Sequence, residues 1–164
     1  MAAATSRLEE QVGGMLRERG LKLATAESCT GGLLASRLTD VPGSSEYFLG
    51  GIVAYAYDAK VALLKVSWDT LQTFGAVSSE TVLEMARGAC KALDANLAIS
   101  ISGIAGPGGG LPNKPVGTTW FGLVASSGEW SFLRQFKGNR LENKAQACET
   151  ALQLVMEYLR GGLK

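Results

Sequence analysis

A strand that runs almost directly into a helix is the feature that most constrains the fold of this chain. Residues 21–27 form a short apolar run typical of a buried strand, and residues 30–38 form a helical run. Strands that alternate with helices are typical of α/β folds, in which ligands bind beyond the carboxyl ends of the strands. The turn between the two runs is therefore the first candidate for a functional site.

This turn carries a hydroxyl group and two glycines. Ser28 follows the strand, and Thr30, Gly31 and Gly32 open the helix. The first amides of a helix favour an anion, and glycines let a ligand approach the backbone closely. A serine or threonine before a helix is also a common N-cap. The local sequence leaves both interpretations open, a helix cap and a reactive site.

Helical and strand-like patterns continue along the chain and predict its architecture. We expect further helices over residues 5–20, 59–65, 69–74, 79–94 and 140–160, and further strands over residues 46–56, 96–102, 116–126 and 129–137. The expected helix caps are Asp58, Ser67 or Asp69, and Ser78. The pair Gly50 and Gly51 should bulge or bend its strand. This order predicts an α/β fold, a three-layer α/β/α sandwich with a mixed β-sheet, as one domain over residues 1–164.

The absence of histidine limits the chemistry that the chain can perform. Its 164 residues include no His and carry a net charge of +1. Ser-His-Asp and Cys-His mechanisms are excluded, and so are most zinc and non-haem iron sites. Any general base must be Lys, Tyr, Asp, Glu or Cys. We expect no metal and no cofactor.

Charge and cysteine usage bear on partners and compartment. The small net charge gives no electrostatic reason to expect nucleic acid or an acidic membrane surface as a partner. No segment has the pattern of a signal peptide or a membrane span. Cys29, Cys90 and Cys148 are far apart and form no Cys-x-x-Cys motif, which fits a reducing, cytoplasmic setting.

A lysine can take the place of histidine beside a serine nucleophile if its neutral form accepts the proton. Tyr55 is expected at the end of a strand, and Lys60 follows in the first turn of the next helix. The lysine would need a pKa lowered from about 10.4 toward about 7–8, and Tyr55 could orient it or relay the proton. The alternatives are a solvated lysine and a core tyrosine. Cys29 is a rival nucleophile without an obvious activator nearby in the sequence.

A second glycine-rich loop follows a predicted strand at residues 102–110. Its free amides could bind an anion, although it matches neither a Walker A loop nor a dinucleotide fingerprint. Arg140, at the start of the last helix, could bind a phosphate or carboxylate bidentately. Glu27 could contact Lys60 or a ligand hydroxyl. The alternatives are a connecting loop, an exposed arginine and a solvated strand end.

Six motifs occur in order and together resemble the CinA C-terminal domain family. They are Thr-Ala-Glu-Ser-Cys-Thr-Gly-Gly at 25–32, Pro-Gly-Ser-Ser-x-Tyr-Phe-x-Gly-Gly at 42–51, Tyr-x-x-x-x-Lys at 55–60, Gly-Ala-Val-Ser-x-Glu at 75–80, Ser-Gly-Ile-Ala-Gly-Pro at 102–107 and Pro-Val-Gly-Thr at 115–118. The resemblance covers about residues 5–160. It implies an α/β/α domain, usually homodimeric, of the stand-alone form without the molybdopterin-binding-like domain that precedes it in full-length CinA proteins.

The resemblance also implies an activity, nicotinamide-nucleotide amidohydrolase, which converts nicotinamide mononucleotide and water to nicotinate mononucleotide and ammonia without a metal. It implies catalytic roles for Ser28, Tyr55 and Lys60. We expect the oxyanion to be stabilised by main-chain amides of residues 29–32. The expected substrate-binding residues are Glu27, Thr30, Gly31, Gly32, Ser102, Gly103, Ala105, Gly106 and Arg140. The alternative function is a catalytically silent nucleotide-binding or regulatory module of the same family. A metal-dependent phosphohydrolase is disfavoured because the acidic residues form no recognisable pair.

Overall fold

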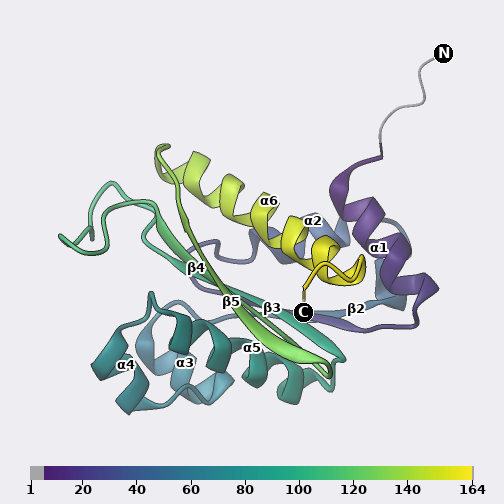
Figure 1. Cartoon of the computed structure of the whole chain (residues 1–164), viewed down its shortest axis with the longest axis horizontal. Helices are drawn as coiled ribbons and strands as arrows, with labels where there is room; N and C mark the ends of the chain where they lie inside the picture. Colours follow the sequence, from purple (N-terminus) through teal and green to yellow (C-terminus); the bar gives the residue numbers. More distant parts are fainter. Residues whose placement is uncertain (1–5, 164) are drawn as a thin grey trace.

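Five strands form one mixed sheet at the centre of the computed structural model, which describes residues 6–163 (Figure 1). The strands are β1 (Leu23–Glu27), β2 (Phe48–Val53), β3 (Leu97–Gly103), β4 (Thr118–Ala125) and β5 (Gly128–Gln135). Their order across the sheet is β2-β1-β3-β4-β5. β1 is parallel to β2 and β3, whereas β4 is antiparallel to β3 and β5. The predicted mixed sheet is confirmed.

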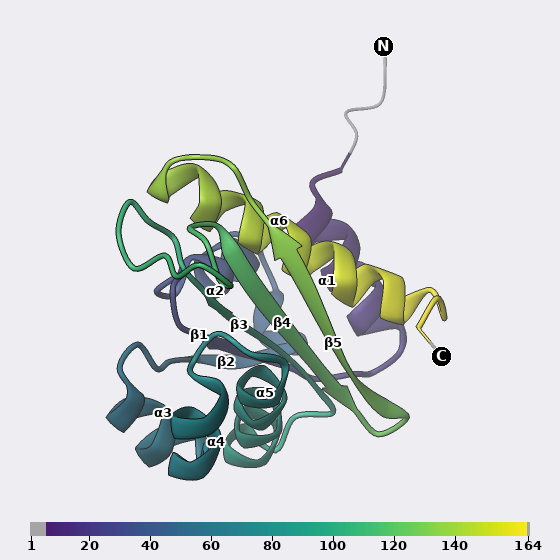
Figure 2. The same ribbon diagram turned by 60° about the vertical axis from the view of Figure 1, so that its left-hand side comes forward.

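Helices cover both faces of this sheet, as Figures 1 and 2 show. One layer consists of α1 (Leu8–Glu18), α2 (Leu33–Thr39) and α6 (Arg140–Leu159), and the other of α3 (Tyr57–Leu64), α4 (Trp68–Phe74) and α5 (Ser79–Leu93). The three-layer α/β/α prediction is therefore confirmed. Residue 5, where the first helix was expected to begin, lies outside the described residues. None of the helices described in residues 6–163 is long and apolar enough to cross a membrane.

A separate apolar core fills each side of the sheet. Leu23, Ile99 and Phe121 belong to the core under α1, α2 and α6, and Ala24 and Ala98 belong to the core under α3 and α5. All of β1 and nearly all of β3 are buried. Parallel strands that are covered on both faces have continuous apolar sequences rather than alternating ones. Continuous apolar runs are the pattern from which these two strands were predicted.

The glycine pair in β2 accompanies a bulge rather than a break. Leu23 pairs with Phe48, but Ala24 pairs with Gly50, so one extra residue is accommodated in β2. A Cβ on Gly51 would lie 2.5 Å from the Thr25 hydroxyl. The glycine therefore permits close packing at this point of the strand pair. The strand is shorter than the predicted 46–56: a short 3-10 helix takes up residues 44–46 at its start, and the strand ends at Val53.

The helix caps agree with the sequence at two positions and differ at a third. Ser67 and Ser78 cap α4 and α5, since the side chain of each accepts a hydrogen bond from the amide three residues on. The prediction of Asp58 as a cap is wrong: α3 begins at Tyr57, with Ala56 in the N-cap position. The Lys60 amide already donates to the Ala56 carbonyl, so Asp58 lies inside the first turn.

Candidate active site

Ser28 and Lys60 meet at the carboxyl end of β1. The Ser28 amide donates to the Ile101 carbonyl over 2.9 Å, which extends the pairing of β1 with β3 by one residue. Lys60 lies in the first turn of α3, the helix that follows β2. Its Nζ is 2.8 Å from the Ser28 Oγ, although the two residues are 32 positions apart. Ser28 is 7% exposed and Lys60 is fully buried.

Two main-chain carbonyls complete the surroundings of the lysine nitrogen. Nζ lies 2.9 Å from the oxygen of Ala54 and 2.8 Å from that of Tyr55. A neutral amine has two N–H donors and one lone pair. The two carbonyls can accept both N–H groups, and the lone pair can then accept the Ser28 hydroxyl proton. The three oxygens also match the three N–H groups of the ammonium, so the geometry accommodates both forms and the ionisation of Lys60 decides between them.

Burial moves the ionisation of Lys60 in the same direction. Removal from water lowers the pKa of the Lys60 ammonium from 10.5 to about 8, with the nearby Cys29 opposing the shift in part. Burial penalises the charged form of a lysine, and no carboxylate is hydrogen-bonded to this one. An amine with a pKa near neutrality combines a useful neutral fraction with basicity.

A cavity of about 190 Å³ opens beside the serine and the lysine. Seven of the predicted site residues line it: Ser28, Tyr55, Lys60, Ser102, Gly103, Ala105 and Arg140. Cys29, Ala76 and Val77 also line it. Ala76 and Val77 were not assigned to the site from the sequence, although the motif at 75–80 contains them. Ala76 is joined directly to a predicted site residue, because the Ser102 Oγ donates a hydrogen bond to the Ala76 carbonyl over 2.7 Å.

The Tyr55 side chain lies at the mouth of this cavity. Its phenol oxygen accepts a hydrogen bond from Arg140 at 3.1 Å, and the residue is 61% exposed. The contact with Lys60 is made by the main-chain carbonyl of Tyr55 instead. In this arrangement Tyr55 positions the lysine through its backbone, and its side chain holds Arg140.

Arg140 connects three segments that are distant in the sequence. It is the first residue of α6, whose N-terminus is closed by a capping box between Asn139 and Glu142. Besides the Tyr55 phenol, its guanidinium donates to the Gly106 carbonyl over 2.8 Å. The start of α6, the loop after β3 and the turn after β2 thus meet at the cavity mouth. Two contacts leave further N–H groups of the guanidinium for an anion.

Glu27 does not face the cavity as the sequence suggested. It is fully buried, and its two carboxylate oxygens accept hydrogen bonds from the amides of Leu34 and Ala35 at 2.9 and 3.0 Å. A carboxylate at the positive end of a helix is favourable, and this one satisfies amides that would otherwise be free. The positive end of α2 is therefore occupied by the protein itself.

Thr30 does not cap α2, although a threonine before a helix is a common N-cap. The helix begins at Leu33 after Gly32, which has a φ of 98° and provides no side-chain cap. Gly31 also has a positive φ, 62°, and its amide donates to the Ser28 carbonyl. This amide is thus not available for an oxyanion. Thr30, Gly31, Gly32, Glu27 and Gly106 are not among the residues that line the cavity.

Cys29 is a poorer nucleophile than its neighbour. Burial raises the pKa of its thiol to about 11, so the thiol is protonated at neutral pH. The lysine nitrogen is hydrogen-bonded to Ser28. Among residues 6–163, no group of three or more Cys, Asp or Glu side chains is arranged to hold a metal ion.

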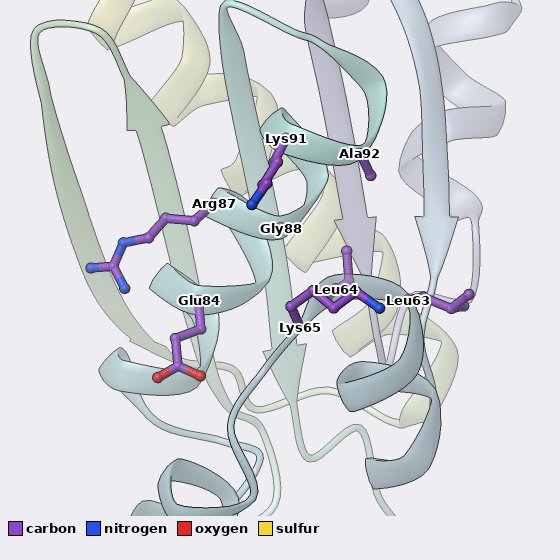
Figure 3. Close-up of a pocket in the computed structure, with 8 residues that line it drawn as sticks. All are labelled: Leu63, Leu64, Lys65, Glu84, Arg87, Gly88, Lys91 and Ala92. Carbon is purple, nitrogen blue, oxygen red and sulfur yellow. The ribbon is translucent and has the colours of Figure 1, made fainter.

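A larger groove of about 450 Å³ lies elsewhere, between α3 and α5 (Figure 3). The apolar side chains that line it include Leu63, Leu64 and Ala92, and its charged lining residues include Lys65 and Lys91. It contains no serine, cysteine or buried base, so the chemistry points to the smaller cavity at Ser28.

Known proteins resemble this chain over nearly its whole length. A family model described as the CinA C-terminal domain matches residues 5–159. The nicotinamide-nucleotide amidohydrolase PncC of Escherichia coli K12 is 48% identical over 151 residues, which are 92% of this chain and 92% of that protein. A CinA-like protein of Chlorobium limicola is 49% identical over 97% of this chain. The chain spans only 38% of the length of that relative.

Solved structures agree with the sequence matches. The competence/damage inducible protein CihA of Agrobacterium tumefaciens has a TM-score of 0.89 and 40% identity, with 98% of this chain and 99% of that chain covered. The competence damage-inducible protein A of Klebsiella pneumoniae has a TM-score of 0.91 and 36% identity, with 93% and 95% covered. The family model, the sequence identity and the fold agree, and the chain belongs to the CinA C-terminal domain family.

Proposed function

We propose that this chain hydrolyses the carboxamide of nicotinamide mononucleotide to nicotinate mononucleotide and ammonia. The observation that carries the proposal is the buried Lys60 amine, 2.8 Å from the Ser28 hydroxyl and directed by two carbonyls. The similarity to the Escherichia coli nicotinamide-nucleotide amidohydrolase, over 92% of both chains, supports this choice of substrate.

The reaction proceeds by acyl transfer. The Ser28 oxygen forms a bond to the carboxamide carbon while its proton passes to the neutral Lys60. The tetrahedral intermediate then loses its C–N bond, and ammonia leaves with the proton returned by Lys60. A water molecule attacks the resulting ester, with Lys60 accepting its proton, and the acid product departs as the proton returns to Ser28. The cationic pyridinium ring makes the carbonyl carbon more electrophilic.

A main-chain amide next to Ser28 is the donor for the oxyanion. The Gly103 amide, which also lines the cavity, is engaged by the Cys29 thiol and would have to leave that sulfur to reach an oxyanion. The Cys29 amide, directly after the nucleophile in the chain, is therefore the donor that we propose for the oxyanion. Loss of one such donor typically lowers the rate about 10²–10³-fold.

Ammonia release from nicotinamide mononucleotide tests the proposal. We expect the wild type to release ammonia, Ser28→Ala to release none and to keep its folded stability, and the control Ser36→Ala, at an exposed serine on α2, to behave as wild type. Free nicotinamide should be a much poorer substrate. Turnover by Ser28→Ala would refute the assignment of the nucleophile.

The catalytically silent nucleotide-binding module is the competing function. It would use the same cavity without a reactive serine. Under that function nicotinamide mononucleotide would stabilise wild type and Ser28→Ala equally against heat, and neither would release ammonia.

We also propose that the protein acts as a homodimer in the cytoplasm. Three free cysteines fit a reducing compartment. β2 is an edge strand, and its outward side chains Leu49 and Val53 are 41% and 46% exposed. An apolar edge of this kind favours self-association. Light scattering during size-exclusion chromatography measures the mass, and a monomer at micromolar concentration would refute the dimer.

A further inference from the structure

We propose that Lys144, with Arg140, forms a clamp for the substrate phosphate and so selects a nucleotide over the corresponding nucleoside. The inference rests on the proposed function, because it concerns how the same substrate is held. Its subject is a residue that the sequence motifs did not single out.

The size of the cavity places the phosphate outside it. About 190 Å³ is enough for an aromatic ring with its carboxamide but small against the roughly 300–1,000 Å³ typical of pockets for whole ligands of this size. When the carboxamide carbon lies at Ser28, the ribose and the phosphate extend past the cavity mouth. Arg140 stands at that mouth.

Lys144 lies one helical turn beyond Arg140, on the same face of α6. Its Nζ is 4.0 Å from the place that a Cβ on Gly31 would take. The Gly31 amide is in turn 3.1 Å from the Ser28 carbonyl oxygen. With ordinary bond lengths, the ammonium therefore lies within about 10 Å of that oxygen. This upper bound places the ammonium close enough to Ser28 to contact the phosphate of a nucleotide whose carboxamide lies at that residue.

The lysine has no counter-ion of its own. It is half-buried, and no hydrogen bond or ion pair joins its ammonium to any of residues 6–163. The carboxylates nearest to it along the helix are already used: Glu142 closes the N-terminus of α6, and Glu149 pairs with Arg37. Glu27 is bound to the amides of α2. A half-buried, unpaired ammonium is a favourable place for an anion.

The backbone opposite Lys144 adds donors. Within the described part of the chain, the amides of Thr30 and Gly32 have no hydrogen-bond acceptor. The Gly31 amide between them donates to the Ser28 carbonyl, so these two amides are separate donors rather than a continuous anion nest. A phosphate monoester carries about −1.5 to −2 charges near neutral pH, which two cations and these amides together can match.

Kinetics on a nucleotide and a nucleoside test the clamp. Ammonia release is measured with nicotinamide mononucleotide and with nicotinamide riboside, which has the same cationic ring and no phosphate. The variants are Lys144→Met, of similar length without charge, Lys144→Arg, which keeps the charge, and Lys91→Met, a matched control on the exposed surface of α5.

We expect Lys144→Met to lower kcat/KM for the mononucleotide by about 10- to 100-fold, the range of a lost charge-assisted contact, and to leave the riboside within about 2-fold. Lys144→Arg should recover most of the loss, and Lys91→Met should change neither substrate. An equal loss on both substrates, or no loss on the mononucleotide, would overturn the clamp.

Calorimetric binding of the same two compounds separates this inference from the proposed function. If the wild type released no ammonia yet bound the mononucleotide more tightly than the riboside, and Lys144→Met removed that preference, the reaction would be refuted and the clamp supported. If the wild type had no preference for the mononucleotide in binding or in turnover, the clamp would be refuted.

Discussion

The pH dependence of the reaction follows from the burial of Lys60. With a pKa of about 8, roughly one molecule in ten has a neutral Lys60 at pH 7 and one in a hundred at pH 6. Only the neutral amine can accept the Ser28 proton. We therefore expect kcat/KM to rise about tenfold per pH unit up to pH 8 and to level off above about pH 9. An unshifted lysine would make the rate rise until about pH 10.5.

The shifted pKa of Lys60 also makes the free energy of unfolding depend on pH. The pKa of Lys60 is lower in the folded chain than in the unfolded chain, so between pH 8 and 10.5 the unfolded chain binds more protons. The contribution of Lys60 to the free energy of unfolding therefore increases as the pH rises from 8 to 10.5. At 1.36 kcal/mol per pH unit the whole gain is about 3 kcal/mol.

Comparison with Lys60→Met isolates the effect. The methionine leaves the carbonyls of Ala54 and Tyr55 without their donor, but that loss is the same at every pH. Urea denaturation of both proteins from pH 7 to 10.5 should show the wild type gaining about 3 kcal/mol relative to the variant. The variant should also release no ammonia at any pH. A rate that is flat from pH 6 to 9, or a wild type that gains nothing relative to Lys60→Met, would refute a buried neutral base.

Three further substitutions test other parts of the site. Tyr55→Phe keeps the carbonyl that holds Lys60 and removes only the contact with Arg140. We therefore expect KM to rise and kcat to change by less than about 10-fold. A fall in kcat of about 100-fold would reveal a proton relay through the phenol. Glu27→Gln removes the negative charge at the N-terminus of α2, and urea denaturation should show a free energy of unfolding lower by about 1–2 kcal/mol. Lost activity at unchanged stability would instead indicate a substrate contact. Gly88→Ala places a Cβ 2.0 Å from the Leu64 carbonyl oxygen and should lower the free energy of unfolding by about 1–3 kcal/mol. Activity should fall as well, because α3 carries Lys60. A wild-type melting temperature would show that the two helices can separate freely.

The architecture was accessible from the sequence because its signals are local. The buried strands read as short apolar runs, and α5 shows its buried face at helical spacing behind a serine cap. Element boundaries were less accessible. The start of α3 at Tyr57 depends on where the chain leaves β2, and a polar residue such as Asp58 can stand in a first turn as readily as at a cap.

The members of the site were accessible, but some of their contacts were not. Ser28 and Lys60 are separated by 32 residues, and only the parallel pairing of β1 with β2 brings their elements together. The direction of the Tyr55 side chain and the partners of Glu27 are tertiary facts that no spacing encodes. Lys144 escaped notice for a similar reason, since an isolated lysine on a helix is ordinary until a backbone turn from elsewhere lies over it.

Charge placement explains how one small cavity can accept a cationic ring beside a lysine. A charged Lys60 would repel a pyridinium ring, whereas the neutral amine favoured by burial does not, so the same shift that makes the lysine a base also admits the substrate. Glu27 occupies the positive end of α2, which leaves little positive field at the ring from that helix. The positive charge of the site is held instead on α6, by Arg140 at the cavity mouth and by Lys144 beyond it, where the proposed clamp places the phosphate. In the proposed binding mode, charge orients the substrate, with its cationic end toward a neutral base and its anionic end toward two cations.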